Sequence, residues 1–200
     1  MCRKVILIRH PKVCAAMEGV CYGQEDVDLA AGWEGSLTES LSVLQQLQEH
    51  EKPTTVWHSD LQRAAQPAKW IARQLSVGAS PTVALRERDF GSWQMKRWDE
   101  IPEEEVMRCH EMLELPETYR PGGGETTYEV QLRACRWLKS LLRYDATNAA
   151  VIAVAHSGTI TAIAGAVHNL PPIQWTPYYL SPSKHLVLEL AYDTLDNFRA

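Results

Sequence analysis

The stretch that decides the fold is VIAVAHSG, residues 151–158. Its first five residues are apolar, which is the length and composition typical of a strand buried on both faces of a parallel sheet. His156 and Ser157 follow directly, and the apolar residues of 158–167 predict a helix after them. Strand, short turn and helix form the repeating unit of open α/β sheets, so we expect the centre of such a sheet here.

A similar strand opens the chain. Residues 5–8, VILI, form a β-branched apolar run that ends at Arg9 and His10. In open α/β sheets, ligands bind at the carboxyl ends of the strands. Taken alone, a histidine at a strand end is as often a capping or packing residue as a functional one. Because His10 and His156 follow two strands of one predicted sheet, we interpret them as parts of a shared site.

The remaining periodicity completes an α/β pattern. Leucines at helical spacing predict a helix over residues 30–50, and Pro67 is expected in the first turns of a helix or at a kink. The expected fold class is α/β, a three-layer, mainly parallel sheet with helices on both faces. We find no repeat or linker and predict one domain over residues 1–200. The other elements expected are helices at 64–75, 103–115 and 128–144, and strands at 54–58, 82–85 and 186–190.

Composition narrows the class of protein. The 200 residues carry a net charge of −5, which argues against a nucleic-acid partner because phosphate-backbone binding usually needs a basic face. Five cysteines, an odd number with no paired spacing, indicate a reducing compartment. The apolar run at residues 5–8 is too short for a signal sequence or a membrane span. We therefore expect a cytoplasmic protein with no membrane partner.

Two further charged residues stand at chemically useful places. Arg63 lies in a predicted turn between a strand and a helix, where its planar guanidinium could hold phosphate oxygens. Glu87 lies among arginines in a charged and aromatic loop, residues 86–99. Each alone is more simply explained as a solvated arginine or as half of a surface ion pair. Their place in the order of the motifs favours function.

Five motifs occur in a fixed order along the chain. They are Arg9-His10 after a strand, SDLQRA at 59–64, LRERDFG at 85–91, GGET at 123–126 and AHSG at 155–158. In this order, over residues 5–167, they resemble the signatures of the histidine phosphatase (phosphoglycerate-mutase-like) superfamily. The likeness is strongest to the α-ribazole phosphatase type, because RHPKV at 9–13 is followed by CYGQEDVDL at 21–29.

The resemblance implies metal-independent hydrolysis of a small-molecule phosphomonoester through a phosphohistidine intermediate. His10, Glu87 and His156 would be catalytic: His10 as nucleophile, Glu87 as acid and then base, and His156 as a cation on the phosphoryl oxygens. Chemistry supports these roles, because protein cations must stabilise the phosphoryl charge when no metal does.

The substrate-binding residues that the resemblance implies are Arg9, Arg63, Tyr22 and Ser157. The main-chain N–H groups of Ser157 and Gly158 would add donors. No metal or cofactor is expected, and the partner is a small phosphate ester, with α-ribazole 5′-phosphate as the candidate. A homo-oligomer is compatible with the sequence. Trp93 and Trp98 could line a pocket for a ring-bearing leaving group, although simple packing is the favoured interpretation.

Two residues depart from the family pattern. Pro11 stands where the family usually has glycine, which removes an N–H and stiffens the loop. Ala16 stands where many members carry a phosphate-contacting asparagine, so that contact is either missing or supplied elsewhere, for example by Lys12 or Tyr22. These changes put the substrate and the rate in question but leave the proposed catalytic residues in place.

Two other functions are weighed against hydrolysis: a mutase that would use the same residues, and a binding module that would usually lack one of them. A phosphoglycerate-type mutase would return the phosphoryl group to its substrate, but such enzymes tend to have a longer chain with an insertion after the glutamate loop. A catalytically inactive phosphate-ester binding module would usually have lost a histidine. Because His10, Arg63, Glu87 and His156 are all present, hydrolysis is the favoured interpretation.

Overall fold

The computed structural model describes residues 2–144 and 149–191, and its centre is a five-stranded sheet in the order β4-β3-β6-β1-β7. Adjacent strands pair in parallel except β7, which runs antiparallel to β1 at one edge. The expected mainly parallel sheet is confirmed. The strands are β1 (Cys2–Arg9), β3 (Thr55–Ser59), β4 (Gly78–Thr82), β6 (Val151–Ala155) and β7 (His185–Ala191).

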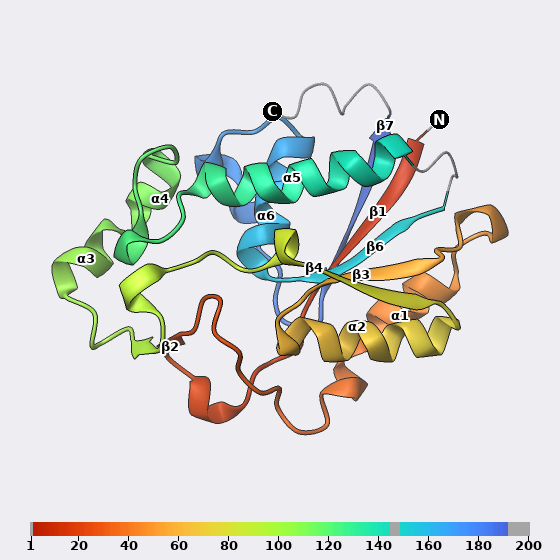
Figure 1. Ribbon diagram of the computed structural model, residues 1–200, viewed down its shortest axis with the longest axis horizontal. Helices are drawn as coiled ribbons and strands as arrows, with labels where there is room; N and C mark the ends of the chain where they lie inside the picture. Colours follow the sequence, from red (N-terminus) through yellow and green to blue (C-terminus); the bar gives the residue numbers. More distant parts are fainter. Residues whose placement is uncertain (1, 145–148, 192–200) are drawn as a thin grey trace.

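Helices cover both faces of this sheet (Figure 1). One face packs against α5 (Thr127–Tyr144) and α6 (Ser157–Val167), and the other against α1 (Thr38–Gln45) and α2 (Gln62–Leu75). Within β1, the side chains alternate between two cores. Val5 and Leu7 join the core under α5 and α6, while Ile6 and Ile8 join the core over α1 and α2. This alternation explains why residues 5–8 of β1 and all of β6 are apolar, and it confirms the three layers.

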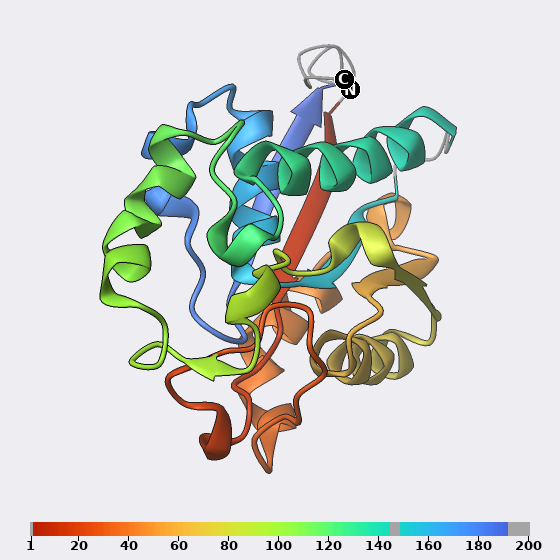
Figure 2. The same ribbon diagram turned by 60° about the vertical axis from the view of Figure 1, so that its left-hand side comes forward.

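A small excursion lies beside the carboxyl end of the sheet. The short strands β2 (Val20–Cys21) and β5 (Lys96–Arg97) pair antiparallel and lead into α3 (Glu103–Met107) and α4 (Glu111–Glu114) (Figure 1, Figure 2). Trp93, 1% exposed, packs at the centre of this excursion and donates its indole N–H to Glu105. Trp98 makes an edge contact with it. Packing is therefore the role of Trp93, while Trp98 remains 39% exposed.

The strand predicted at residues 82–85 is wrong. The strand there is β4, which ends at Thr82, and Val83–Leu85 form a turn of 3-10 helix. The apolar residues that suggested a strand belong to this turn, where Leu85 is buried and Val83 is 64% exposed. As an edge strand, β4 needs no apolar run and tolerates Pro81.

Two predicted helices are shorter than expected. The region 30–50 contains a 3-10 helix (Trp33–Leu37) and then α1, because Gly32 takes a left-handed conformation with φ of 70° before the first turn. The region 103–115 divides into α3, a 3-10 turn and α4. The other helices agree to within two residues, and Pro67 lies inside α2 as expected. Within the described part of the chain, no helix has the length and hydrophobicity that a membrane span requires.

Candidate active site

His10 and His156 meet at the carboxyl edge of the sheet. Strands β1 and β6 pair in parallel with Arg9 opposite Ala155, so the residue after each strand emerges at the same place. The main-chain N–H of His10 donates to the carbonyl of Ala155 at 3.0 Å. The two rings lie edge to face with centroids 5.1 Å apart, and both residues are buried. The structure thus brings together the two histidines that sequence reasoning placed in one site.

The hydrogen bonding of His10 leaves one ring nitrogen free. Its Nδ1 lies 2.6 Å from the carbonyl oxygen of Pro11. Because a carbonyl can only accept, we assign the proton to Nδ1, which leaves the lone pair of Nε2 available. Burial, helped by the positive charges of Arg63 and Arg9, lowers the pKa of His10 from 6.5 to about 3. His10 is therefore a neutral imidazole with an exposed electron pair, as a nucleophile must be.

We expect His10 to stay neutral in the folded protein well below pH 6.5. Because its pKa is lowered on folding, the unfolded chain takes up a proton below about pH 6.5 and the folded chain does so only near pH 3, so stability falls as the pH drops through that window. Nitrogen-15 NMR should show the Nδ1–H tautomer without titration from pH 8 to 4.5. A midpoint near 6.5, like that of the urea-unfolded chain, would contradict the assignment.

Two arginines lie at the same edge of the sheet, and main-chain carbonyls hold the guanidinium group of each. Arg63, in the first turn of α2, is fully buried and donates to the carbonyls of Glu25 and Gly23, with the ring of Tyr22 stacked at 4.9 Å. Arg9 donates to the carbonyl of Leu180 at 2.6 Å. Within residues 2–144 and 149–191, no carboxylate forms an ion pair with either arginine. Their charges are therefore available to an anion.

Unused buried donors gather at this edge. Of the six buried side-chain nitrogens that have no hydrogen-bond partner in the described residues, four belong to the site: Nε of Arg9, Nε of Arg63 and both ring nitrogens of His156. Buried polar groups are nearly always paired, so such a concentration calls for acceptor oxygens. Burial, together with the charge of Arg63, also lowers the pKa of His156, so its ring is a neutral imidazole with one N–H to donate and not the cation that the resemblance implied. This arrangement fits a bound phosphoryl group.

Glu87 reaches the site from the loop that follows β4. Its Oε2 accepts from the N–H of Gly158 at 3.2 Å, and its Oε1 from the N–H of Arg88 at 2.9 Å. The N–H of Gly158, which sequence reasoning offered to the phosphate, is therefore used to hold Glu87. The Ser157 hydroxyl donates to the carbonyl of Leu180 at 3.4 Å. For Ser157, the main-chain N–H remains the candidate donor to substrate.

Gly158 is required by the position of Glu87. A Cβ on residue 158 would clash with Oε1 of Glu87. We expect Gly158→Ala to displace the carboxylate and to slow hydrolysis of alkyl phosphate esters by about 10- to 100-fold, the effect of misplacing a catalytic group by about 1 Å. The melting temperature should change little, because the end of a glutamate side chain can move. Gly35→Ala, with open space around its Cβ, is the control. Full activity of Gly158→Ala would disprove this requirement.

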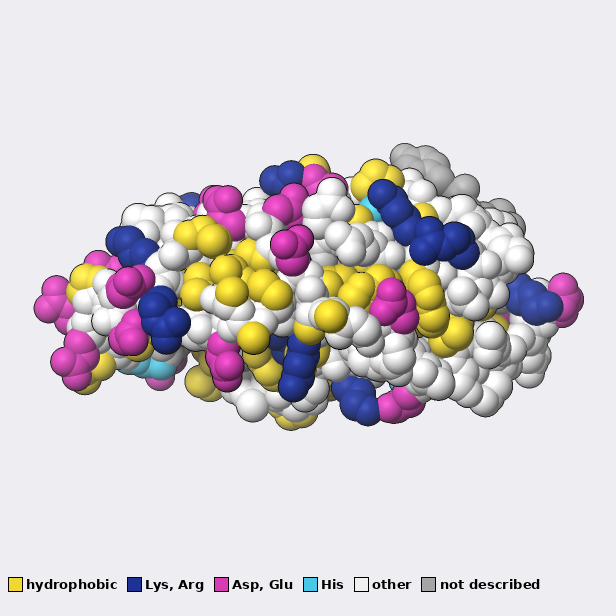
Figure 3. All heavy atoms as spheres, turned by 90° about the horizontal axis from the view of Figure 1, so that it is seen from below, with side chains coloured by type: hydrophobic (Ala, Val, Ile, Leu, Met, Phe, Trp, Pro, Cys, Tyr) yellow, Lys and Arg dark blue, Asp and Glu magenta, His cyan; other side chains and the backbone are white. Residues whose placement is uncertain are grey.

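A cavity of about 510 Å³ opens beside the two residues Arg9 and His10. Apolar side chains make much of its wall, and Lys12 and Tyr22 supply polar groups. The face that carries the segment after β1 shows a band of hydrophobic side chains bordered by charged ones (Figure 3). Ala16 is exposed and does not line the cavity, whereas Lys12 and Tyr22 do. The lining includes Val13, Met17, Val20 and Pro182.

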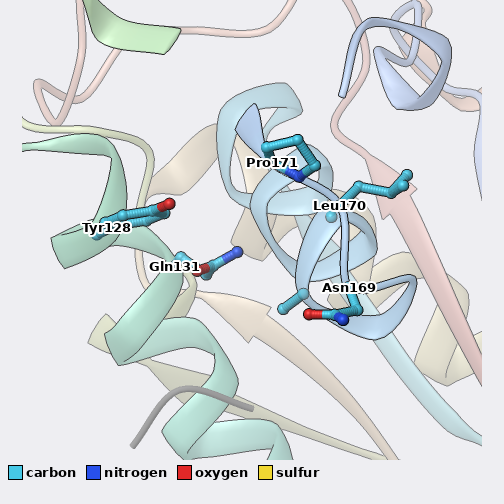
Figure 4. Close-up of a pocket in the computed structure, with 7 residues that line it drawn as sticks. Tyr128, Gln131, Asn169, Leu170 and Pro171 are labelled. Carbon is cyan, nitrogen blue, oxygen red and sulfur yellow. The ribbon is translucent and has the colours of Figure 1, made fainter. Parts of the chain in front are cut away.

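A second cavity, of about 200 Å³, lies at the far end of α6 (Figure 4). Tyr128 and Gln131 of α5 face Asn169, Leu170 and Pro171 across it. Its wall includes Gly165, which is about 12 Å along α6 from Ser157 at 1.5 Å per residue. It contains none of the residues predicted for the site. In the described part of the chain, no group of three or more histidine, cysteine, aspartate or glutamate side chains could hold a metal ion.

Sequence reasoning missed the segment that follows α6. The ring of Tyr179 lies 5.4 Å from the guanidinium of Arg9, and the carbonyl of Leu180 holds that guanidinium. Ser183 donates its N–H to the carbonyls of Arg9 and His10. These contacts are made mainly by the backbone, so no residue pattern announces them. Antiparallel pairing of β7 with β1 is what brings the segment to the site.

The fold and the site together define a class of protein. It is a three-layer α/β protein with a buried, positively charged site for an anion, built around two histidines at the ends of neighbouring strands. The chain belongs to the histidine phosphatase superfamily (branch 1), whose family model matches residues 5–196. The phosphatase class predicted from the sequence agrees with this membership. A metal-independent phosphoserine phosphatase of Arabidopsis thaliana is 29% identical over 162 residues, covering 80% of this chain and 66% of that protein. The chain thus spans just under two thirds of that relative.

Solved structures agree in fold. A native mycobacterial glucosyl-3-phosphoglycerate phosphatase superposes with a TM-score of 0.81 at 22% identity, over 100% of this chain and 96% of that one. An α-ribazole phosphatase from Shigella flexneri superposes with a TM-score of 0.78 at 18% identity, over 94% of this chain and 91% of that one. At these identities the likeness establishes the three-layer fold alone.

Proposed function

We propose that the protein hydrolyses a small-molecule phosphomonoester in two steps through a phosphohistidine on His10. The observation that carries the proposal is the set of unpaired buried donors of Arg9, Arg63 and His156 around a neutral His10 imidazole. The donors suit the phosphoryl oxygens, and the free Nε2 suits attack on phosphorus.

In the first step, Nε2 of His10 attacks phosphorus in line with the bond to the leaving oxygen. An N–P bond forms as the P–O bond breaks, and the leaving oxygen takes its proton from the carboxyl group of Glu87. Arg9, Arg63 and His156 stabilise the negative charge on the other three oxygens. The proton on Nδ1, held by the carbonyl of Pro11, keeps the ring in the required tautomer.

In the second step, water attacks the phosphohistidine. The Glu87 carboxylate, now deprotonated, takes a proton from the water as the new P–O bond forms and the N–P bond breaks. Inorganic phosphate leaves, and His10 regains its neutral form with Glu87 protonated again. No electron transfer or metal ion is needed in either step.

For the substrate, we propose α-ribazole 5′-phosphate. The residues after His10 carry the likeness to the α-ribazole phosphatase type, and the cavity beside His10 offers apolar walls to a ring-bearing leaving group. Relatives named for phosphoserine and for glucosyl-3-phosphoglycerate make these two esters the competing substrates to test.

A phosphate-release assay over these esters tests the substrate. We expect α-ribazole 5′-phosphate to give the highest kcat/KM of the panel. Preference for phosphoserine or glucosyl-3-phosphoglycerate would replace it, and similar values throughout would indicate a broad small-molecule phosphatase. Transfer of the phosphoryl group within 3-phosphoglycerate, without phosphate release, would instead reveal a mutase. Binding without turnover would reveal an inactive module.

Activity should persist in excess EDTA and be inhibited by vanadate. The hydrogen-bond donors that stabilise the phosphoryl oxygens belong to arginine and histidine side chains, so chelation removes nothing that the proposed steps use. Vanadate can become five-coordinate on Nε2 of His10 and so resemble the transition state. The test is to measure initial rates of phosphate release with and without EDTA, and with and without vanadate. Loss of activity in EDTA that a divalent cation restores would overturn the metal-independent mechanism.

The cellular setting is also part of the proposal. The four described cysteines, Cys14, Cys21, Cys109 and Cys135, are unpaired, which suits a reducing cytoplasm. Four further expectations stay predictions: that the protein has no nucleic-acid partner, that it has no membrane partner, that it can form a homo-oligomer, and that residues 1–200 form a single domain.

A further inference from the structure

Two sequence motifs have no place in the proposed steps, CYGQ at 21–24 and GGET at 123–126. In the structure, both supply a side chain to the loop that carries Glu87. Glu125, from the second motif, binds Arg133 of α5 directly. Gln24, from the first motif, contacts Glu125 and the carbonyl of Glu87, and Arg133 also binds both of these groups.

Arg133 holds the main chain of the Glu87 loop. Its two terminal nitrogens donate to three main-chain acceptors within four residues, the carbonyls of Ala84 at 2.9 Å, Arg86 at 2.8 Å and Glu87 at 2.9 Å. Its side chain is 20% exposed, so these bonds form largely away from water. One guanidinium therefore fixes the backbone on both sides of Leu85 and at Glu87 itself.

Glu125 holds Arg133 in turn. Its two oxygens accept from Nε and a terminal nitrogen of Arg133 at 2.8 and 2.9 Å, the bidentate geometry that gives strong and directional pairs. Oε2 also accepts the N–H of Asp89 at 2.9 Å. Burial raises the pKa of Glu125, but the bonds from Arg133 and Asp89 outweigh burial and the net shift is downward. Glu125 thus stays ionised beneath the loop.

Gln24 joins this pair to the phosphate side of the site. Its amide donates to the carbonyl of Glu87 at 3.0 Å and lies 3.4 Å from Oε2 of Glu125. The preceding residue, Gly23, accepts a hydrogen bond from Arg63 through its carbonyl. The backbone that anchors Arg63 is therefore continuous with the side chain that anchors Glu87.

The position of the Glu87 carboxyl depends on this support. The carboxyl itself is held by two N–H groups, of Arg88 and Gly158, and the first of these belongs to the same loop. A shift of the loop backbone would move both the carboxyl and one of its two anchors. Proton transfer to a leaving oxygen tolerates little displacement, since a misplacement of about 1 Å can cost about 100-fold in rate.

We propose that the Arg133–Glu125 ion pair, with Gln24, is the positioning device that sets Glu87 for proton transfer. This inference rests on the proposed function, in which Glu87 is the general acid and base. Arg133 and Glu125 act through Glu87 and do not touch the substrate.

The test compares Arg133→Met, Arg133→Lys and Glu125→Gln by rapid-quench single turnover. We expect Arg133→Met and Glu125→Gln to slow phosphoenzyme formation from an alkyl phosphate by about 10- to 100-fold. Formation from p-nitrophenyl phosphate, whose leaving group needs no proton, should change less than threefold. Arg133→Lys keeps the charge but lacks the planar fork, so it should recover part of the alkyl rate. Arg108→Met, which breaks a bidentate pair with Glu111 in the excursion, is the matched control.

A double-mutant cycle with Glu87→Gln separates positioning from general support. If Arg133 and Glu125 act through Glu87, then Glu125→Gln should add no alkyl-specific loss in the Glu87→Gln background. Equal slowing of both esters, or an added alkyl-specific loss in that background, would overturn the inference. Should Arg133→Met fail to fold, Arg133→Lys and Glu125→Gln decide. If Glu87→Gln slows the alkyl phosphate no more than p-nitrophenyl phosphate, the proposed role of Glu87 as the general acid is wrong. This result differs from those that overturn the positioning role of Arg133 and Glu125, so failure of the proposed function and failure of the inference are distinguished.

Discussion

Replacing His10 with alanine is expected to reduce phosphate release on the order of 10⁶-fold, the scale on which enzymes lose activity when a covalent nucleophile is removed. The reason is geometric as well as chemical. At the carboxyl edge of the sheet, the carbonyl of Pro11 leaves His10 Nε2 unprotonated, and burial keeps the ring neutral because the pKa of His10 is lowered to about 3. Without this nitrogen, the arginines can still bind the phosphate ester, but no nucleophile is present to accept the phosphoryl group.

Labelling with ³²P-substrate identifies the nucleophile directly. The wild-type protein should retain an acid-labile, base-stable label after quenching, and His10→Ala should retain none. His58→Ala is the matched control, because His58 is also buried and also bonds the next residue's carbonyl through Nδ1. It should keep the label. Undiminished labelling of His10→Ala would move the nucleophile elsewhere, first to His156.

The sequence predicts the centre of this fold well because the centre obeys local rules. Residues 5–8 of β1 and all of β6 are buried on both faces and are therefore apolar, which makes both strands recognisable and places His10 and His156 at their ends. The edge strand β4 obeys no such rule. Its residues, Gly78 to Thr82, pair on one side alone, so the apolar turn after it gave the stronger but misleading signal.

The part of the site that the sequence missed depends on contacts across long separations. Arg9 is held by the carbonyl of Leu180, and Glu87 by the N–H of Gly158. A backbone group carries no side-chain identity, so its partner cannot be deduced from residue types. Arg133 likewise lies on a helix whose pattern indicates packing, and its three carbonyl partners become visible when α5 is docked.

Glu87→Gln should separate the two steps of the proposed reaction. The amide keeps the size of the side chain but can neither donate the carboxyl proton nor accept one from water. With an alkyl phosphate the first step should slow by about 10²- to 10⁴-fold, the usual contribution of a positioned acid. With p-nitrophenyl phosphate the leaving group departs as a stable anion, so the first step should be nearly unchanged.

The second step distinguishes an acid and base from a structural support. Because Glu87 also takes the proton from water, dephosphorylation should be slow in the variant whichever ester is used. Stopped-flow measurements with p-nitrophenyl phosphate should therefore show a burst of nitrophenol equal to the enzyme concentration, then a slow steady state with phosphohistidine accumulated. Glu25→Gln, whose carbonyl rather than its carboxylate contacts Arg63, should show neither change and serves as the control. Equal slowing of both esters without a burst would mean that Glu87 mainly supports the arginines, and the proton donor would then have to lie elsewhere among residues 86–99.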